Sequence, residues 1–365
     1  MHRESSIPTI PYMKLRNKIL AGVLFLGFLA LTSFYYNFWV TSRPFGVIIL
    51  LADGLDNQLM AEARQLSDGS LRELSLDTMS AIALLSHKPK DSSIPDAAAY
   101  ATSIATGSSG RINRLSLNQS GHPLKTLLDE AKNKKRVTGI LTNAELSTPW
   151  VSAFYANHGD ATRSQEILSQ LVDLQRVDLA IGRGSLGFLP VSEGGFRDDG
   201  RNLFQELQEN HYSLPKNIAD LENSPFWRPP KLVAVFDNLQ VTSKNEISDQ
   251  KNIWLHDVLR HAIRLLQYNP RGYLLIVNVE PHAFPSPDNQ QKPSKPGDST
   301  LYLDRCIKVA RKYAGDKTLI VALGKPDASL QEQKDTVIAA TGPGSEKFHG
   351  VMTGTKVFSI LKDEL

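Results

Sequence analysis

Apolar runs separated by amphipathic stretches set the pattern of the chain after residue 44. Each run has the length and composition of a strand that is buried on both faces of a sheet. The stretches between the runs carry apolar residues at helical spacing, as in 122–135, 254–269 and 299–315. Alternating strands and helices predict an α/β fold, a three-layer α/β/α sandwich with a mainly parallel central sheet. The expected strands are 45–54, 136–143, 177–184, 231–236, 272–280, 318–324 and 336–344.

Polar residues stand at the carboxyl ends of several expected strands. Asp53 closes the first run, Asn278 and Glu280 close the run at 272–280, and the segment 324–327 closes the next one. Ligands of such sheets bind at the carboxyl ends of the strands, so these residues are expected to converge on one site.

The amino-terminal part of the chain has a different pattern. Residues 19–42 contain no charged side chain, and the run is long enough to cross roughly 30 Å of hydrocarbon as a helix. Basic residues precede it between positions 14 and 18, and aromatic residues crowd its far end. The positive-inside rule then predicts a cytoplasmic tail at 1–18, a transmembrane signal anchor at 19–42 and an extracytoplasmic domain at 43–365.

Alternatives remain open for both ends. A cleaved signal peptide usually has a shorter apolar core followed by small residues, whereas bulky aromatic residues follow this run. Residues 362–365 read Lys-Asp-Glu-Leu, which is either a lumenal retention signal or simply the end of a helix. The domain is therefore expected in a periplasmic, cell-surface or lumenal compartment.

Composition narrows the classes of partner. The net charge of +3 is small for 365 residues, and no basic patch is interleaved with aromatic residues, so nucleic-acid binding is not expected. Cys306 is the only cysteine, which excludes an intramolecular disulfide and any metal site built from cysteines. A membrane, reached through the apolar helix, is the partner that the sequence indicates most directly.

One small-residue stretch, IPDAAAYATSIATGSSGRIN at 94–113, resembles the signature of the alkaline phosphatase family. In that signature an Asp-Ser pair is followed by small residues and a closing Thr-Gly. The likeness continues in the same order through 47–54, 126–156, 197–203, 269–277 and 342–358. The resemblance implies an alkaline-phosphatase-like fold, hydrolysis of phosphomonoesters through a phosphoserine, and a site with two zinc ions and one magnesium ion.

Few residues of that site have a counterpart here. The resemblance aligns Asp53 with the carboxylate that joins a zinc to the magnesium, and Thr148 with a magnesium-binding hydroxyl. It aligns Asp96 with the acid beside the nucleophile, and Arg163 is a displaced candidate for the arginine that clamps phosphate. Simpler roles stay open: Asp53 in an Asx turn, Thr148 in a turn before proline, and Asp96 as a helix cap.

The remaining positions of the family site appear degenerate. The nucleophile falls on Ala97, whose methyl group has no oxygen to attack phosphorus. Zinc needs about three protein ligands, and neither zinc position retains more than one. The resemblance therefore implies a pseudophosphatase that binds no cofactor, although the family uses zinc and magnesium. The positions of lost ligands are Asn278, Ala283, Pro287, Lys325, Pro326 and Gln331.

Lys325 is the most unusual of these residues. The resemblance puts its ammonium near Asp53, where a zinc ion would lie, and a buried carboxylate without any cation is costly. We expect Lys325 to replace the lost cation, and with Arg163 it could hold a phosphate-containing or other anionic ligand.

Three function classes follow from this sequence. The first is a membrane-anchored binding or scaffold module without phosphomonoesterase activity. The second is an active metal-dependent hydrolase with an altered site, and the third is a purely structural domain. The altered site could draw on Glu280, His282, Asp288 or Asp327 for a metal, with Thr102 or Ser103 in new roles.

Overall fold

The computed structural model describes residues 11–35, 43–53, 55–65, 73–87, 96–241, 253–280, 297–326 and 335–365. The chain divides into residues Met1–Arg43 and a compact unit, Pro44–Leu365. Each part is described by itself.

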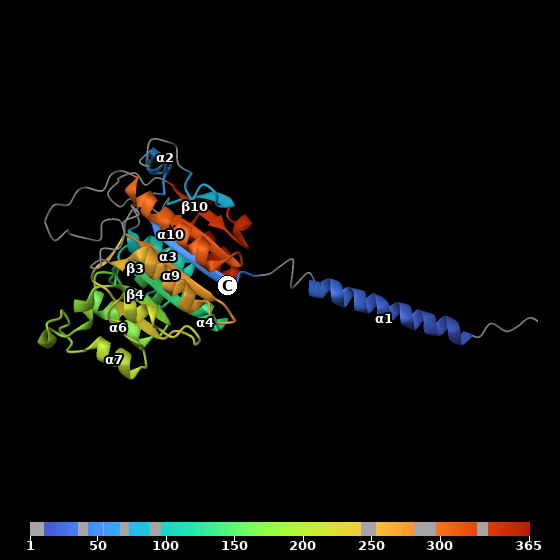
Figure 1. Cartoon of the computed structure of the whole chain (residues 1–365), viewed down its shortest axis with the longest axis horizontal. Helices are drawn as coiled ribbons and strands as arrows, with labels where there is room; N and C mark the ends of the chain where they lie inside the picture. The colour runs from blue at the N-terminus through green and yellow to red at the C-terminus, as the bar shows by residue number, and fades with distance from the viewer. Residues whose placement is uncertain are drawn as a thin grey trace, which may run out of the picture. The chain divides into compact units, whose positions relative to one another are not determined.

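A nine-stranded sheet forms the centre of the compact unit, in the order β11-β2-β10-β9-β1-β8-β3-β4-β5 (Figure 1). Neighbouring strands from β9 to β5 run parallel, whereas β10 is antiparallel to both β9 and β2. The α/β fold with a mainly parallel sheet is thus confirmed. The strands are β1 (Gly46–Ala52), β2 (Ala81–Leu85), β3 (Val137–Glu145), β4 (Leu179–Arg183), β5 (Leu232–Val235), β8 (Tyr273–Val279), β9 (Thr318–Gly324), β10 (Thr336–Thr341) and β11 (Gly350–Met352), and β6 (Leu239–Gln240) and β7 (Ile253–Trp254) form a separate pair.

Helices cover both faces of the sheet because its central strands are apolar on both sides. In β1, Val47, Ile49 and Leu51 belong to one apolar core, and the alternate residues Ile48 and Leu50 belong to the other. The first core includes residues of α3 (Ala97–Thr106), α4 (Leu127–Asn133), α5 (Pro149–Tyr155), α6 (Ser164–Asp173), α7 (Leu203–Glu209) and α11 (Gly354–Glu364). The second includes residues of α2 (Asn57–Gln65), α8 (Ile218–Glu222), α9 (Leu255–Leu266) and α10 (Asp298–Ala314).

Two strands of the nine-stranded sheet were not predicted from the sequence, and neither was the short pair β6 and β7. β2 is half-exposed, with Ile82 55% exposed, so it lacks the continuous apolar run that identifies the central strands. β11 has only three residues and gains its place by pairing with β2. Both lie at the antiparallel side of the sheet, where local pattern carries little information.

The carboxyl-terminal residues are packed into the compact unit. Leu365 is 2% exposed, and the buried Glu364 carboxylate pairs with Lys347. The reading of 362–365 as the end of a helix therefore matches α11, which runs to Glu364.

The amino-terminal part contains α1 (Pro11–Tyr35). Within it, Arg16–Tyr35 is the one described helix that is long and apolar enough to cross a membrane. Residues 36–42, the end of the expected span, lie outside the described residues.

Candidate functional site

Three neighbouring parallel strands deliver the charged residues of the site. β9, β1 and β8 lie side by side, with Ala52 of β1 in register with Gly324 of β9 and Val279 of β8. The next residue of each strand is therefore Lys325, Asp53 or Glu280, and the Lys325 N–H donates to the Ala52 carbonyl at 2.9 Å. The convergence expected from topology is present in the structure.

The Lys325 ammonium is enclosed by these carboxylates. Its Nζ lies 2.7 Å from Glu280 Oε1 and 3.7 Å from Asp53 Oδ1, and its side chain is 1% exposed. The Trp150 ring lies below the same Nζ, 5.4 Å away at its centroid, within the range of a cation–π contact. We call Lys325, Glu280 and Asp53 the lysine–carboxylate cluster.

A second set of polar residues fixes Glu280. The Glu280 N–H donates to Asn143 Oδ1 at 2.8 Å, and Asn143 Nδ2 donates back to the Glu280 carbonyl at 2.6 Å. Asn278 Nδ2 donates to Thr142 Oγ1 at 3.0 Å and to Glu280 Oε1 at 3.2 Å. Asn278 is fully buried, and its Oδ1 has no hydrogen-bond partner among the described residues.

This arrangement does not fit a divalent metal ion. Lysine has only donor hydrogens, and its charge repels a cation at the place where Glu280 and Asp53 could otherwise coordinate one. Asn278 offers a neutral amide where the family resemblance implies a carboxylate, and Pro326 offers no side-chain ligand. Among the residues that the structure describes, no group of three His, Cys, Asp or Glu could hold a metal ion. Ala283, Pro287 and Gln331 lie outside the described residues, as do His282, Asp288 and Asp327.

Asp96 caps α3 and joins it to a loop. One of its carboxylate oxygens accepts from the Ala99 N–H at 2.9 Å, and the other accepts from the Asn113 N–H at 2.7 Å. Asn113 Nδ2 in turn donates to Asp160 at 2.9 Å. Asp96 therefore has the capping geometry, and Ala97 beside it is the first residue of the helix.

Thr102 and Ser103 are occupied within the fold. Thr102 Oγ1 accepts from the Ser116 N–H at 3.0 Å, and Ser103 Oγ donates to the Tyr100 carbonyl at 2.8 Å. Thr102 is 1% exposed. Both hydroxyls therefore have hydrogen-bond partners inside the fold.

Thr148 and Arg163 line a cleft of about 1010 Å³ beside the ends of β3 and β4. Thr148 precedes α5 without a side-chain capping bond, and its carbonyl accepts from the Val151 and Ser152 N–H groups. The Arg163 guanidinium is 61% exposed and pairs with Glu166 at 3.2 Å. Lys325 is not among the residues that line the cleft.

The charges of the cleft are mixed. Its other charged residues are Arg183 and the acids Glu145, Glu166, Asp198 and Asp237. Burial lowers the pKa of the Arg183 guanidinium, although the neighbouring Asp237 and Glu145 oppose this. Burial also disfavours ionisation of Asp237, but hydrogen bonds from Ser185 and Gly184 outweigh it, so its pKa is lowered and it stays a carboxylate.

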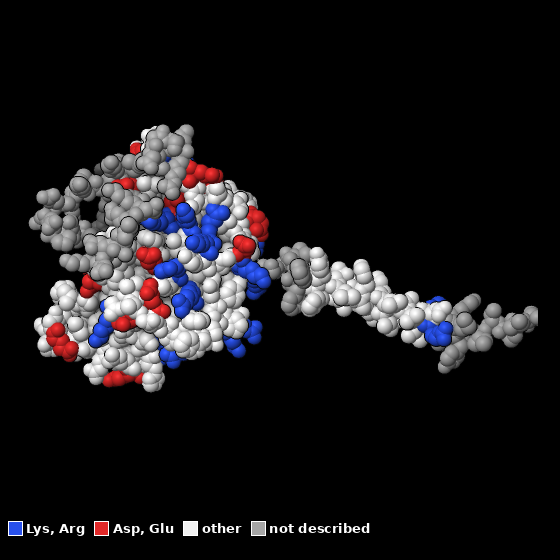
Figure 2. Space-filling view, viewed as in Figure 1, with Lys and Arg blue, Asp and Glu red and all other residues white. Residues whose placement is uncertain are grey.

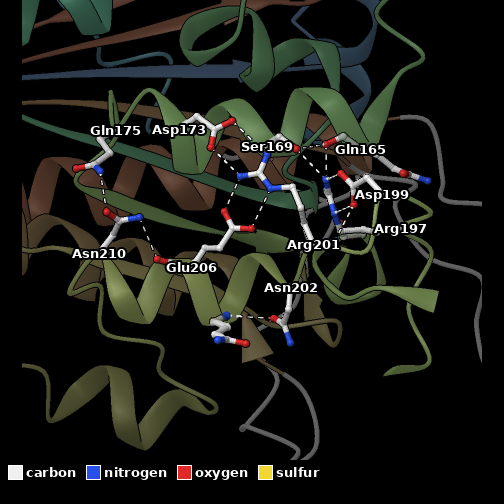
Figure 3. A network of polar contacts seen from close by, with 12 residues as sticks. Gln165, Ser169, Asp173, Gln175, Arg197, Asp199, Arg201, Asn202, Glu206 and Asn210 are labelled. Carbon is white, nitrogen blue, oxygen red and sulfur yellow. Dashed lines mark hydrogen bonds and ion pairs between the residues drawn. The ribbon is translucent and has the colours of Figure 1, made fainter. Parts of the chain in front are cut away.

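A buried arginine that sequence reasoning did not single out supports one wall of the cleft (Figure 3). Arg197 is 1% exposed and donates to the Gln165 carbonyl at 3.0 Å, to the Gly187 carbonyl at 3.3 Å and to Ser169 Oγ at 2.8 Å. It also pairs with Asp199, and those hydrogen bonds lower the pKa of the carboxyl. Because Gln165 and Gly187 line the cleft, this network fixes α6 against the segment after β4.

The histidines of the sequence are scattered rather than gathered. His158 Nε2 lies 2.7 Å from Glu166, His256 lies beside Asp257, and His349 is exposed. They form no common site in the described part of the chain.

Comparisons with known proteins agree on one family. A family model described as "Alkaline phosphatase" matches residues 46–330. Alkaline phosphatase 4 of Bacillus subtilis (strain 168) is 24% identical over 204 residues, covering 54% of this chain and 42% of that protein. The membrane-bound alkaline phosphatase of Bombyx mori is 24% identical over 327 residues, covering 75% of this chain and 58% of that protein.

Solved structures show the same fold. The alkaline phosphatase of the Antarctic bacterium TAB5 superposes with a TM-score of 0.68 at 17% identity, covering 89% of this chain and 98% of that one. A variant of that enzyme has Mg bound. The chain spans about half the length of the curated relatives it matches, since it covers 42%, 50% and 58% of three of them.

Proposed function

Because the chain belongs to the alkaline phosphatase family, we propose that it is a member that has exchanged metal-dependent hydrolysis for a binding or scaffold role. In this proposal residues 1–18 are a cytoplasmic tail, 19–42 are a transmembrane anchor and 43–365 are an extracytoplasmic domain. The single apolar helix at Arg16–Tyr35 supports the anchor.

The observation that carries the proposal is the lysine–carboxylate cluster. An ammonium 2.7 Å from Glu280 and 3.7 Å from Asp53 occupies the space between two carboxylates that a metal ion would need and compensates one of their two negative charges. Removing such a buried pair of charges from water is tolerable because the charges are opposite and hydrogen-bonded. We propose that Lys325 replaces the family's cation in holding Asp53 at this edge of the sheet.

The nucleophile position supports the same conclusion. The family resemblance aligns Ala97 with the serine that attacks phosphorus, and a methyl group can neither be deprotonated nor form a phosphoenzyme. Thr102 and Ser103, the two hydroxyls proposed for an altered site, are both hydrogen-bonded within the fold.

An anionic ligand would meet Arg163 rather than a metal. Arg163 and Arg183 are the two cations that line the described cleft, and Arg163 is the more accessible of them. We propose that a phosphate-bearing ligand, if it binds this cleft, is held by Arg163. Inorganic phosphate should then raise the unfolding temperature of the unaltered chain, and the Arg163→Ala variant should lose that shift.

The decisive experiment combines metal analysis with an activity assay. The full chain, purified in detergent with zinc and magnesium present, should carry well under one ion of either metal. It should also hydrolyse a chromogenic phosphate monoester no faster than the buffer blank, against typical enzyme turnover of about 1–10³ s⁻¹.

Asp53→Ala is the matched control, because it removes the one carboxylate that the family resemblance assigns to metal binding. Activity or bound zinc that is present in the unaltered chain and lost in Asp53→Ala would contradict the proposal and favour an altered hydrolase. Activity that is equal in both proteins and follows the chain through purification would also contradict the proposal, because an altered site built on Glu280 or His282 would not need Asp53.

A further inference from the structure

The loops that lead into the parallel strands form the edge of the sheet opposite the lysine–carboxylate cluster. Phe45 precedes β1, Arg136 precedes β3, Gly272 precedes β8 and Lys317 precedes β9. Since β9, β1, β8 and β3 are consecutive in the sheet, the four loops are neighbours in space.

Buried side chains tie these loops into one rigid set. The Arg136 guanidinium donates to the Pro44 carbonyl at 2.8 Å and to the Phe45 carbonyl at 2.9 Å. Asn269 Nδ2 donates to the Lys135 carbonyl at 2.9 Å and to the Gly272 carbonyl at 3.0 Å. The Phe45 N–H donates to the Lys317 carbonyl at 2.7 Å.

Gly272 shows how closely the loops approach one another. Its φ is +84°, and a Cβ at this position would lie 1.8 Å from the Phe45 carbonyl oxygen. Only glycine permits both the backbone conformation and the contact. The edge is therefore preorganised, and the side chains on it are held in fixed relative positions.

Exposed lysine and arginine side chains lie on the loops of this edge of the sheet. Lys135, Arg271 and Lys317 are all exposed, and each stands on a different loop. We call these three residues the basic rim. Two aromatic side chains flank it at the ends of the preceding helices, Tyr268 at 48% and Tyr313 at 38% exposure. Figure 2 shows further Lys and Arg side chains gathered over α9 and α10, the helices that run toward this edge.

The rim lies at the end of the compact unit where the chain enters from the amino-terminal part. Pro44 and Phe45 begin the unit and are bound to the rim loops, whereas α1 ends at Tyr35. The proposed anchor continues to residue 42, so in sequence only Arg43 separates it from Pro44. Any membrane that α1 spans is consequently within reach of the rim.

We propose that the basic rim binds the anionic phospholipid headgroups of the membrane in which the chain is anchored. Lysine and arginine are attracted to any membrane surface that carries anionic headgroups, and tyrosine is enriched at membrane–water interfaces. The inference rests on the proposed function in one respect, the transmembrane anchor. If the rim binds lipid, the opposite edge of the sheet, which carries Lys325 and Asp53, is directed away from the membrane.

The test is amide hydrogen exchange on the full chain in lipid nanodiscs. In discs with phosphatidylglycerol added, the amides of 134–136, 271–272 and 316–317 should exchange several-fold more slowly than in discs of phosphatidylcholine alone. The difference should vanish in high salt, because the screening length falls from about 10 Å at 0.1 M to about 3 Å at 1 M. Equal exchange in the two lipids would overturn the inference, and this comparison needs no variant.

Charge-reversal variants locate the effect. Lys135→Glu/Arg271→Glu/Lys317→Glu should abolish the lipid-dependent protection. Arg111→Glu/Lys125→Glu/Lys356→Glu, which reverses three exposed cations outside the rim and outside α9 and α10 and changes the net charge equally, should keep it. Loss in both variants would mean that net charge alone is responsible and would also overturn the inference.

A separate measurement, extraction with alkaline carbonate, tests whether the anchor is embedded in the membrane. Alkaline carbonate releases a chain that is not embedded, so release from vesicles would overturn the anchor and the rim inference together. A chain that resists carbonate but shows no lipid-dependent protection would overturn the rim inference alone.

Discussion

The Lys325 ammonium is buried, and the free energy lost by removing it from water must be offset by the carboxylates beside it. With a side chain 1% exposed, the ammonium depends on Glu280 at 2.7 Å and on Asp53 at 3.7 Å. Removing one member of such a group leaves a charge without compensation, which is more damaging than removing all of them.

Lys325→Met should therefore lower the free energy of unfolding by about 2–4 kcal/mol, measured by urea unfolding in detergent. Adding Glu280→Gln to it should recover part of the loss, because the uncompensated carboxylate is removed. Lys308→Met, at an exposed position of α10, should change stability by less than about 0.5 kcal/mol. A Lys325→Met protein as stable as the unaltered one would show that the cluster contributes nothing.

For single residues, the sequence predicted which side chains lie near one another better than it predicted which of them form hydrogen bonds or ion pairs. That Asp53, Glu280 and Lys325 would meet followed from three strand ends on one edge of a parallel sheet. The pairing of Lys325 with Glu280 did not follow, because it depends on the Asn143 bonds that fix the Glu280 backbone. Arg197 was missed for a similar reason: its partners lie in α6 (Gln165 and Ser169) and in the segment after β4 (Gly187), and nothing near Arg197 in sequence indicates them.

Strand β2 shows the same limit for whole elements. Its pattern of exposed and buried residues becomes a strand only because β10 and β11 pair with it on either side. The residue just after it, His87, is enclosed by this pairing: its Nε2 lies 2.8 Å from Thr336 Oγ1, and its ring stacks edge-on with Tyr100 at 4.8 Å.

His87 gives this part of the sheet a pH dependence. Burial lowers its pKa from 6.5 to about 4, so the unfolded chain binds a proton there more readily than the folded one. The associated stability, roughly 3 kcal/mol, is complete above pH 6.5 and is lost as the pH falls toward 4. His87→Gln, which keeps a hydrogen-bonding side chain but does not titrate, should reduce the slope measured between pH 7.5 and 4.5, and the rest should come from groups such as His256 and His261, whose pKa values are also lowered by burial.

The exposed His349 supplies the control for that measurement. His349→Gln should leave the pH dependence as it is in the unaltered chain. An unchanged slope in His87→Gln would assign the pH dependence to other groups.

For the whole molecule, the single cysteine makes the proposed topology measurable. Cys306 is buried in α10, and burial raises the pKa of its thiol to about 12, so it should not react with a maleimide. A cysteine introduced at Lys356, which is exposed in the compact unit, should be labelled by a membrane-impermeant maleimide applied to the extracytoplasmic side of the membrane. One introduced at Ser5 should be labelled only after the membrane is opened.

If position 5 is labelled from the extracytoplasmic side and position 356 is not, the orientation is the opposite of the one that we propose. The unaltered chain measures the background, because its only thiol is Cys306. Labelling of the unaltered chain would mean that α10 opens on the time scale of the reaction.

The bond between Lys325 and Glu280 also bears on how the proposed loss of metal chemistry could be reversed. A lone change of Lys325 to an acid would place three carboxylates together with no positive charge between them, and a lone change at Ala97 would supply a hydroxyl that nothing activates. Each of these single substitutions would give a chain that is less stable or still inactive. Regaining metal chemistry would therefore need several substitutions together. The Lys325 ammonium, held between two acids, therefore makes the proposed loss difficult to reverse by single substitutions.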